Sequence, residues 1–333
     1  MKRILITGAT GFLGGATARE LKRSGYEVVA TGRKTKVGEQ LRNEGFHFVR
    51  CDLASEKETL RRLADGCEAI VHCAALSSPW GRRADFQASN VAATKSVLEV
   101  CRETGARLIY ISSPSVTFGL FDQHLIREDA AWPEPAANHY IATKREAEKL
   151  VTGQDSVPAI TLRPKALIGP GDTTLLPRVI RTARRGFFPS FKENDPLLDL
   201  TLSDDAVRAI TLALEAGEPC IGKTYHITSG SPIRVSEAFA LLFEACGLEV
   251  RFVPITTQRA LAVAGGLERI SRFFTAGKWE PPLTRYTVGS LAYEQSLDIS
   301  AARADLGYLP QTDIRSALRA CGRRWREQQK SSS

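Results

Sequence analysis

The sequence predicts an α/β fold in which a doubly wound parallel sheet is accompanied by a smaller α/β lobe towards the C-terminus. In the first 165 residues, short β-rich runs alternate with helix-period segments. These runs are apolar on both faces, which is typical of parallel strands covered by helices on both sides. After "LRPKALIGPGD" (162–172) the alternation ends, and proline and glycine become frequent. We therefore assign residues 1–165 to the sheet domain and residues 166–330 mainly to a substrate-binding lobe interleaved with late sheet elements.

Strands and helices of the sheet domain are expected in regular alternation. Right-handed crossovers between parallel strands place ligands at the carboxyl ends of the strands. The predicted strands are "RILIT" (3–7), "EVVAT" (27–31), "HFVRC" (47–51), "AIVHCA" (69–74), "RLIYIS" (107–112) and "AITLRP" (159–164). The predicted helices span 14–24, 35–44, 56–65, 84–104 and 138–152. In the lobe, "KTYHITS" (223–229) is predicted as a short strand and "RALAVAGGLERISRFF" (259–274) as a helix.

Composition favours a soluble enzyme. Hydrophobic residues make up 43% and charged residues 25% of the 333 positions, which allows a sizeable core. No apolar run approaches the roughly 18–20 residues of a membrane span, and no signal region follows Met1, so a cytoplasmic location is expected. The seven scattered cysteines predict reduced thiols, with neither disulfides nor a metal site. The net charge of +8 is spread along the chain, so nucleic acid is not an expected partner.

A glycine-rich turn, "TGATGFLG" (7–14), joins the first strand to the first helix. Its spacing G-x-x-G-x-x-G serves three needs: a tight turn, close approach of a pyrophosphate, and close packing of helix on strand. The phosphates of a dinucleotide would lie at the helix N-terminus, where free N–H groups favour negative charge. This context predicts a Rossmann-type dinucleotide site. Its binding residues in the turn are Gly8, Thr10, Gly11, Phe12, Leu13 and Gly14.

The second strand is where the cofactor is selected. An acidic residue there would bind the ribose hydroxyls of NAD, whereas arginine accommodates the 2′-phosphate of NADP. The chain reads "VVATGRKTK", with Arg33 and Lys34 and no carboxylate, so NADP(H) is preferred and NAD(H) stays possible. Further cofactor contacts are expected after the third strand and after the fourth. These residues are Asp52, Leu53, Ala74 and Ala75.

A Tyr-x-x-x-Lys pair, "YIATK", supplies the candidate chemistry. Tyr140 and Lys144 lie one turn apart on one face of a predicted helix. A neighbouring ammonium stabilises a phenolate, which suits a phenol to proton transfer near neutral pH. The fifth strand ends in "YISSPSVTFG", which puts Ser112 and Ser113 at a carboxyl end of the sheet, where a hydroxyl can polarise a carbonyl.

These segments together resemble an extended short-chain dehydrogenase/reductase of the NAD(P)-dependent epimerase/dehydratase group. The resemblance extends over nearly the whole chain, through "TGATGFLG", "CDL", "HCAA", "NVAATKSVLEVC", "YISSPSV", "YIATK" and "LRPKALIGPGD". It implies a catalytic Ser–Tyr–Lys set, with Tyr140 as proton donor or acceptor. It also implies that Asn90 lies beneath the nicotinamide, that Pro164 lies beside the carboxamide, and that two subunits form a homodimer through the helices carrying Asn90 and Tyr140.

The position of the serine depends on the branch of the family used for comparison. Alignment with the steroid-dehydrogenase-like branch makes Ser113 catalytic, whereas counting back from Gly119, as in sugar epimerases, gives Pro114. We favour Ser113, because proline has no hydroxyl. Sugar dehydratases of the family usually carry an Asp-Glu pair just after this position. Here the corresponding residues are Pro114, Ser115 and Val116, which argues against dehydration.

The similarity is greatest to the branch of 3β-hydroxysteroid dehydrogenases, sterol-4-carboxylate 3-dehydrogenases and 2-alkyl-3-oxoalkanoate reductases. It is carried by "SSPSVTF", "LRPKALIGPGD", "PPLTRYTV" and "LDISAARADLGYLP". It implies reduction of a ketone, or oxidation of the matching alcohol, on a hydrophobic, lipid-like or steroid-like small molecule. The helix at 259–274 could be ordinary core or a wall facing lipid. Two alternatives stay open: a nucleotide-sugar epimerase or reductase, with Arg285 as a diphosphate ligand, and a non-catalytic NADP-binding regulatory protein.

Overall fold

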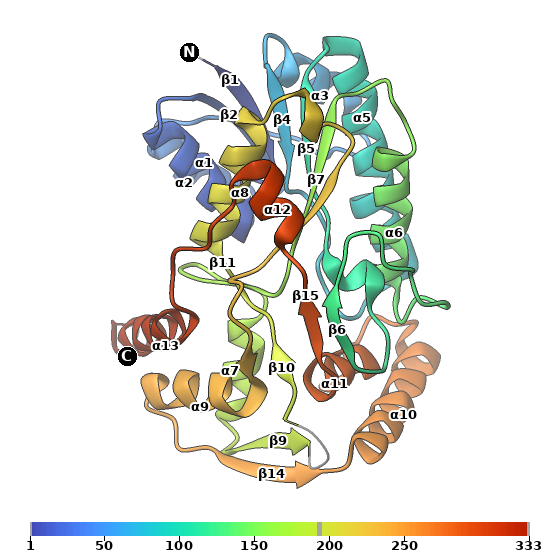
Figure 1. Cartoon of the computed structure of the whole chain (residues 1–333), viewed down its shortest axis with the longest axis vertical. Helices are drawn as coiled ribbons and strands as arrows, with labels where there is room; N and C mark the ends of the chain where they lie inside the picture. Colours follow the sequence, from blue (N-terminus) through green and yellow to red (C-terminus); the bar gives the residue numbers. More distant parts are fainter. Residues whose placement is uncertain (1, 192–194, 332–333) are drawn as a thin grey trace.

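The computed structural model describes residues 2–191 and 195–331, and its upper half in Figure 1 is built on a seven-stranded sheet. The strand order is β12-β7-β5-β4-β1-β2-β3, and every pairing is parallel. The strands are β1 (Arg3–Thr7), β2 (Glu27–Gly32), β3 (His47–Arg50), β4 (Ala69–His72), β5 (Arg107–Ile111), β7 (Ala159–Pro164) and β12 (Thr224–Ile227). The order reverses between β1 and β4, which makes that point the ligand-binding crevice expected of such sheets. The predicted doubly wound sheet is therefore confirmed.

Helices cover both faces of this sheet. One face carries α1 (Phe12–Arg23), α2 (Thr35–Asn43), α8 (Ser203–Glu215) and α12 (Ser300–Leu306). The other carries α3 (Lys57–Ala64), α5 (Ala93–Thr104) and α6 (His139–Thr152). Along β1, Ile4 and Ile6 pack into the hydrophobic core on the face covered by α1 and α8. Leu5 packs into the core on the other face, and all three side chains are fully buried. Burying each such side chain stabilises the fold by roughly 1.5–3 kcal/mol, which explains why the strands are apolar on both faces.

The helix predicted over 84–104 is interrupted. The chain instead forms α4 (Arg83–Phe86), a π-helical turn at Gln87–Ala92, and then α5. Apolar periodicity alone does not reveal the extra residue that a π-turn inserts, because the stripe continues on either side. Such turns often occur at functional sites, and this one carries Asn90.

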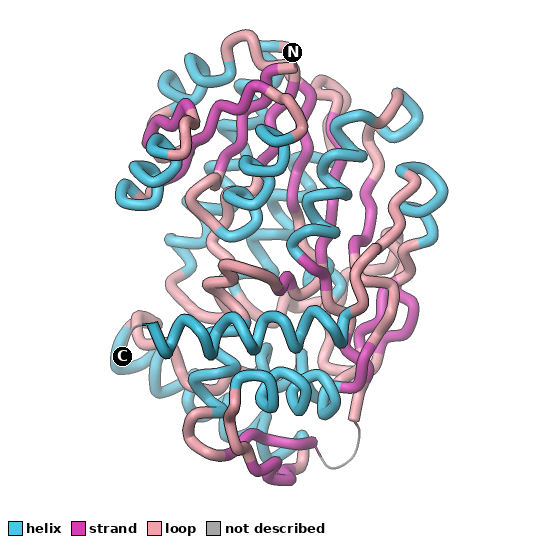
Figure 2. Tube along the Cα trace, turned by 90° about the vertical axis from the view of Figure 1, so that its left-hand side faces the viewer, coloured by secondary structure: helices cyan, strands magenta, loops and turns pink. Residues whose placement is uncertain are grey.

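The lobe forms the lower half of the molecule (Figure 1). Its strands are β6 (Gln123–Ile126), β8 (Leu167–Ile168), β9 (Phe187–Phe191), β10 (Leu197–Leu198), β11 (Thr201–Leu202), β13 (Ile233–Arg234), β14 (Arg251–Ile255) and β15 (Gln295–Leu297). Its helices are α7 (Leu176–Ala183), α9 (Val235–Cys246), α10 (Thr257–Thr275), α11 (Arg285–Ala292) and α13 (Ile314–Ser331). Helices α9 and α13 lie side by side (Figure 2).

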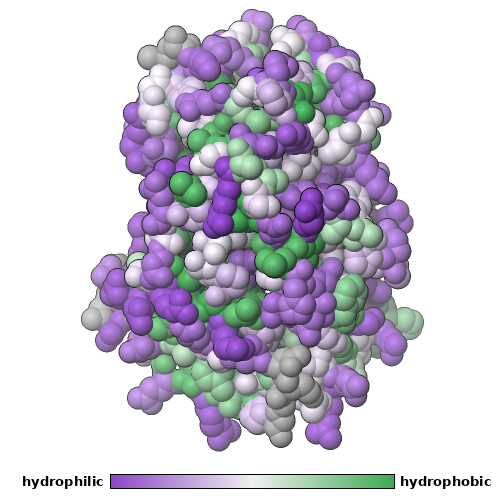
Figure 3. Space-filling model, viewed as in Figure 1, coloured by the Kyte–Doolittle hydropathy of each residue, from purple (hydrophilic) through white to green (hydrophobic). Residues whose placement is uncertain are grey.

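The chain passes between the two halves several times. β6 precedes residue 165 but pairs with β15 in the lobe, whereas α8, β12 and α12 follow residue 165 and pack on the large sheet. On the face drawn in Figure 3, hydrophobic side chains gather where the sheet domain meets the lobe. Among the described residues, no helix combines the length and apolar character needed to cross a membrane. All seven cysteines lie in the described chain as free thiols, and five of them are buried.

Candidate active site

The glycine turn is shaped by two close approaches. Gly8 has a φ of +70°, and a Cβ there would lie 2.7 Å from the backbone nitrogen of Ala74. A Cβ on Gly14 would lie 2.4 Å from the carbonyl oxygen of Gly8. Both positions therefore exclude any side chain, so the turn can fold tightly and α1 can begin directly against it. Gly11 closes the turn by donating its N–H to the Gly8 carbonyl at 2.8 Å.

The N-terminus of α1 fits an anionic group. Gly11 is its N-cap and Phe12 its first residue. The side chain of the N-cap residue makes no hydrogen bond to the N–H groups of the first turn. A Cβ on Gly32 would lie 2.4 Å from the hydroxyl oxygen of Thr10, so the turn abuts the end of β2. Exposed Arg33 and Lys34 follow Gly32 directly. This cradle fits a dinucleotide, with pyrophosphate at the helix and the adenosine end towards β2.

Other predicted cofactor residues lie along the same edge of the sheet. Asp52 and Leu53 follow β3, with one carboxylate oxygen of Asp52 accepting the Ala54 N–H at 3.1 Å. Ala74 and Ala75 follow β4, and Pro164 ends β7. Because the strands are parallel, all these positions share one carboxyl edge. That edge also holds the glycine turn.

Asn90 is 2% exposed and fully engaged with the protein. Its carbonyl oxygen accepts the Leu76 N–H at 2.7 Å, and its amide nitrogen donates to the Leu76 carbonyl at 3.3 Å and to the Thr143 hydroxyl at 3.0 Å. The π-turn thus ties the loop after β4 to the helix that carries the Tyr-Lys pair. These three bonds hold the loop after β4 in place against α6.

Helix α6 presents Tyr140 and Lys144 one turn apart. Asn138 caps the helix by accepting the Ile141 N–H at 2.8 Å. Lys144 is 2% exposed and donates to the Ile111 carbonyl at 2.8 Å and to the Tyr110 hydroxyl at 3.0 Å. Burial lowers the pKa of Lys144 to about 8, so this amine loses its proton much closer to neutral pH than an ordinary lysine does. Tyr140 is half-buried beside Phe86, with ring centroids 6.5 Å apart.

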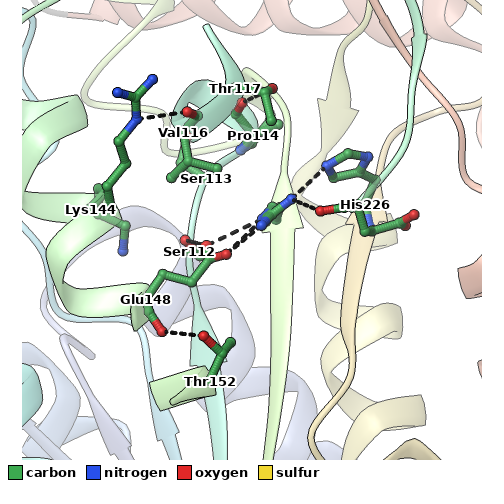
Figure 4. A network of polar contacts seen from close by, with 12 residues as sticks. Ser112, Ser113, Pro114, Val116, Thr117, Lys144, Glu148, Thr152 and His226 are labelled. Carbon is green, nitrogen blue, oxygen red and sulfur yellow. Dashed lines mark hydrogen bonds and ion pairs between the residues drawn. The ribbon is translucent and has the colours of Figure 1, made fainter. Parts of the chain in front are cut away.

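Ser112 belongs to a buried polar network rather than to the cleft (Figure 4). Its hydroxyl donates to Glu148, a carboxylate that is 1% exposed and paired with the equally buried Arg163. The guanidinium of Arg163 also donates to the ring of His226 at 3.2 Å. Burial lowers the pKa of His226 to about 3, so the ring is neutral and its nitrogen can accept this bond. Ser112 thereby connects the end of β5 to α6 and β7.

Ser113 faces a different set of groups. Its side chain caps a 3-10 turn (Pro114–Thr117) by accepting the Ser115 N–H at 3.2 Å, and the two hydroxyls lie 2.9 Å apart. The hydroxyl of Ser115 in turn lies near the phenol of Tyr286, which is also close enough to Tyr140 for the two phenols to interact electrostatically. The hydroxyls of Ser113, Ser115 and Tyr286 therefore form a row after β5, and Tyr140 lies within electrostatic range of Tyr286.

Tyr286 is the residue that sequence reasoning missed. It lies on α11, more than 140 residues beyond the Tyr-Lys pair, in the segment "PPLTRYTV", where no spacing marks it. Its ring packs edge-on against Phe118 with centroids 4.9 Å apart. The contact depends on Gly289, because a Cβ there would lie 2.8 Å from the Phe118 ring. The neighbouring Arg285 is exposed, and its N–H donates to Glu268 at 2.8 Å.

Comparison with known proteins gives the family. A model described as the NAD dependent epimerase/dehydratase family matches residues 4–228. The chain is 34% identical to a 2-alkyl-3-oxoalkanoate reductase of Stenotrophomonas maltophilia, over 95% of this chain and 97% of that protein. It is 30% identical to a 4-hydroxy-2-methyl-3-oxo-4-farnesyl-3,4-dihydroquinoline-1-oxide ketoreductase of Stigmatella aurantiaca, over 92% and 91%. A UDP-glucuronic acid 4-epimerase of Bacillus cereus, solved with NAD, shares the fold with a TM-score of 0.76 and 22% identity over 98% and 99%. This chain is therefore a member of the NAD dependent epimerase/dehydratase family and an NAD(P)-dependent oxidoreductase.

Proposed function

We propose that the protein reduces a ketone on a hydrophobic, lipid-like small molecule with NADPH as cofactor. The observation that carries the proposal is that Tyr140, with buried Lys144 one turn later, lies within electrostatic range of Tyr286, and the Tyr286 phenol adjoins Ser115 and Ser113 at the carboxyl edge of the sheet. This arrangement offers both a hydrogen-bond site for a carbonyl oxygen and a proton donor for it.

The residues divide the work as follows. The nicotinamide, when bound, supplies the hydride that adds to the carbonyl carbon. Ser113 and Tyr140 hydrogen-bond the carbonyl oxygen, and Tyr140 gives that oxygen its phenolic proton, so that a secondary alcohol forms. Lys144 keeps one N–H free after its bonds to Ile111 and Tyr110, and this donor would orient the nicotinamide ribose and stabilise the phenolate.

Arg33 supports NADPH over NADH. Its guanidinium is exposed directly after β2, where a 2′-phosphate would lie, and no carboxylate stands there to bind free ribose hydroxyls.

The ring of Tyr286, packed on buried Phe118 and adjoining Ser115, supports an apolar substrate. Relatives named for alkyl-oxoalkanoate and farnesyl-quinoline reduction point to the same class.

A second candidate, action on a nucleotide sugar, is favoured by the fold shared with nucleotide-sugar epimerases. Exposed Arg285 would have to bind the diphosphate in that case. We also propose that the protein forms a homodimer through α5 and α6, as the family resemblance implies.

The decisive experiment is Tyr140→Phe. We expect turnover to fall by roughly 10²–10⁴, the usual contribution of a general acid, while the Kd for NADPH changes little. Tyr26→Phe is the matched control, because this phenol bonds Glu215 on the opposite side of the domain. Substrates to test are 2-alkyl-3-oxoalkanoates, 3-ketosteroids and nucleotide sugars. Turnover that survives in Tyr140→Phe would refute the assignment, and turnover of nucleotide sugars alone would favour the second candidate.

A further inference from the structure

Helix α10 and the turn after it expose an unusual amount of apolar surface. Of the ten large hydrophobic side chains that are exposed in the described chain, five lie between residues 263 and 279. Phe273 is 83% exposed and Phe274 is 75% exposed. The others are Val263, Ile270 and Trp279. Ordinary proteins expose such residues singly, so a cluster of them marks an interaction surface.

The cluster forms a continuous stripe on one side of α10. Val263, Ile270 and Phe274 are seven and four residues apart, which puts them within about 40° of one another around the helix. The buried residues Ala260, Ala264 and Ser271 are centred about 80° further around the helix, on the side that packs against the lobe. The apolar surface of α10 therefore extends well beyond the side that it buries, and this exposed part has no partner within the described chain. Figure 1 shows the helix at the outer edge of the lobe.

The charges around the stripe are cationic. Exposed Arg269 lies one turn before Phe273, about 40° from it around α10, and exposed Lys278 lies in the turn that leads to Trp279. Arg272 is exposed as well, on the side of α10 away from the stripe. Of the nearby carboxylates, Glu280 pairs with Arg178, whereas Glu268 accepts the backbone N–H of Arg285 and keeps its negative charge. The positive charges of Arg269 and Lys278 together outweigh it. Aromatic side chains next to arginine and lysine are the composition of helices that lie in the interface of an anionic membrane.

From these observations we propose that α10 and the turn to Trp279 dock on an anionic lipid surface, with the helix in the plane of the interface. The alternative occupant, a second copy of this chain, is disfavoured because a two-fold interface would bring Arg269 and Lys278 of one copy towards those of the other. Docking does not depend on the proposed reductase activity.

The docking surface is connected to the rim of the candidate active site. The indole N–H of Trp80, in the loop after β4, donates to the Ser271 hydroxyl at 3.1 Å, and the Arg272 guanidinium stacks over the Trp80 ring at 5.2 Å. The inner side of α10 packs against α11, which carries Tyr286. A shallow depression lined by Gly81, Arg82, Asp85, Gly277 and Lys278 lies between the loop and the end of the helix. A docked lipid surface would therefore adjoin the mouth of the site.

The test is co-sedimentation of the purified full-length protein with two kinds of vesicle, phosphatidylcholine alone and phosphatidylcholine mixed with phosphatidylglycerol. We expect binding to the anionic vesicles that weakens as salt is raised. In the double variant Phe273→Ser/Phe274→Ser, affinity should fall by on the order of tenfold or more. Both rings are largely exposed, so the variant should fold, which a thermal melt would verify.

Leu309→Ser is the matched control, because Leu309 is 62% exposed outside the docking surface. It should bind vesicles like the wild type, whereas Arg269→Gln/Lys278→Gln should lose the preference for anionic lipid. Absence of vesicle binding by the wild type would overturn the proposal. The proposal would also be overturned if the wild type were a dimer that does not bind vesicles and the double phenylalanine variant were a monomer. Equal binding by the wild type and the phenylalanine variant would also overturn it.

Discussion

The Ser112 hydroxyl donates a hydrogen bond to the carboxylate of Glu148, and so Ser112 is anchored in the core while its neighbour Ser113 is not. Two adjacent serines at the end of one strand thus have separate roles. Ser112 joins β5 to the helix that carries the Tyr-Lys pair, and Ser113 lies in the row of hydroxyls that reaches Tyr286.

This division predicts opposite effects for two alanine variants. Ser112→Ala leaves a buried carboxylate short of one donor, so we expect the free energy of unfolding to fall by about 1–3 kcal/mol with turnover per folded molecule largely kept. Ser113→Ala removes a donor to the substrate carbonyl, so we expect kcat to fall by roughly 10²–10³ with a loss of only about 1 kcal/mol in stability. Urea unfolding and steady-state kinetics on both variants measure this. Loss of kcat in Ser112→Ala alone would reverse the assignment.

The Arg163–Glu148 ion pair is 3% and 1% exposed, and its disruption should be severe. Arg163→Leu leaves the Glu148 charge buried without its partner, so we expect a loss of about 3–5 kcal/mol. The double variant Arg163→Leu/Glu148→Leu should be less destabilised than Arg163→Leu, because no unpaired charge remains. Arg19→Gln is the control, since its pair with Glu44 is partly exposed and should contribute under about 1 kcal/mol. Chemical denaturation of the wild type and these three variants measures their free energies of unfolding. A double variant that is less stable than Arg163→Leu would contradict the prediction.

Arg33→Ser tests cofactor selection. Removing a charge-assisted contact to a 2′-phosphate should raise the Kd for NADPH by roughly 10–100-fold and leave the Kd for NADH nearly unchanged. Arg23→Ser, a change at an exposed arginine near the far end of α1, should affect neither constant. Fluorescence titration with both cofactors measures the constants. Tighter binding of NADH than of NADPH by the wild type would remove the basis of the argument.

Lys144 should make the free energy of unfolding depend on pH in the alkaline range. Burial places the pKa of folded Lys144 at about 8, below its ordinary value of 10.5. Between these values the unfolded chain binds more protons than the folded one, so the free energy of unfolding should rise with pH across this window. The rise attributable to Lys144 is on the order of 3 kcal/mol.

Burial also lowers the pKa of Lys165 to about 8, so Lys165 should add a similar rise in the free energy of unfolding. A variant that lacks only Lys144 therefore has to be compared with the wild type. Lys144→Met should be more stable than the wild type near pH 7 and should show a smaller increase between about pH 8 and 10. Urea midpoints along this pH series give the result. Parallel curves for the variant and the wild type would show that Lys144 does not titrate in this range.

The large sheet could be predicted from sequence because its signals are local. Each of the six strands that the first 165 residues contribute to this sheet is a short apolar run, and the glycine turn is recognised from the spacing of three glycines within eight residues. The strand β6, with the sequence QHLI, has no such run and was not predicted. The π-turn around Asn90 could not be predicted, because the apolar pattern continues across it. Nor could Tyr286, since its place beside Ser115 depends on the docking of α11 against Phe118 through Gly289.

By itself, the sequence determined that a dinucleotide turn begins the chain and that Tyr140 and Lys144 share one helical face, because turn and helix geometry follow from residues close together. The tertiary structure alone decided which serine faces the core and which face of α10 stays exposed. Those outcomes depend on partners distant along the chain, such as Glu148, which is 36 residues beyond Ser112. The surroundings of a side chain are determined by packing between secondary-structure elements, and the local sequence pattern does not predict that packing.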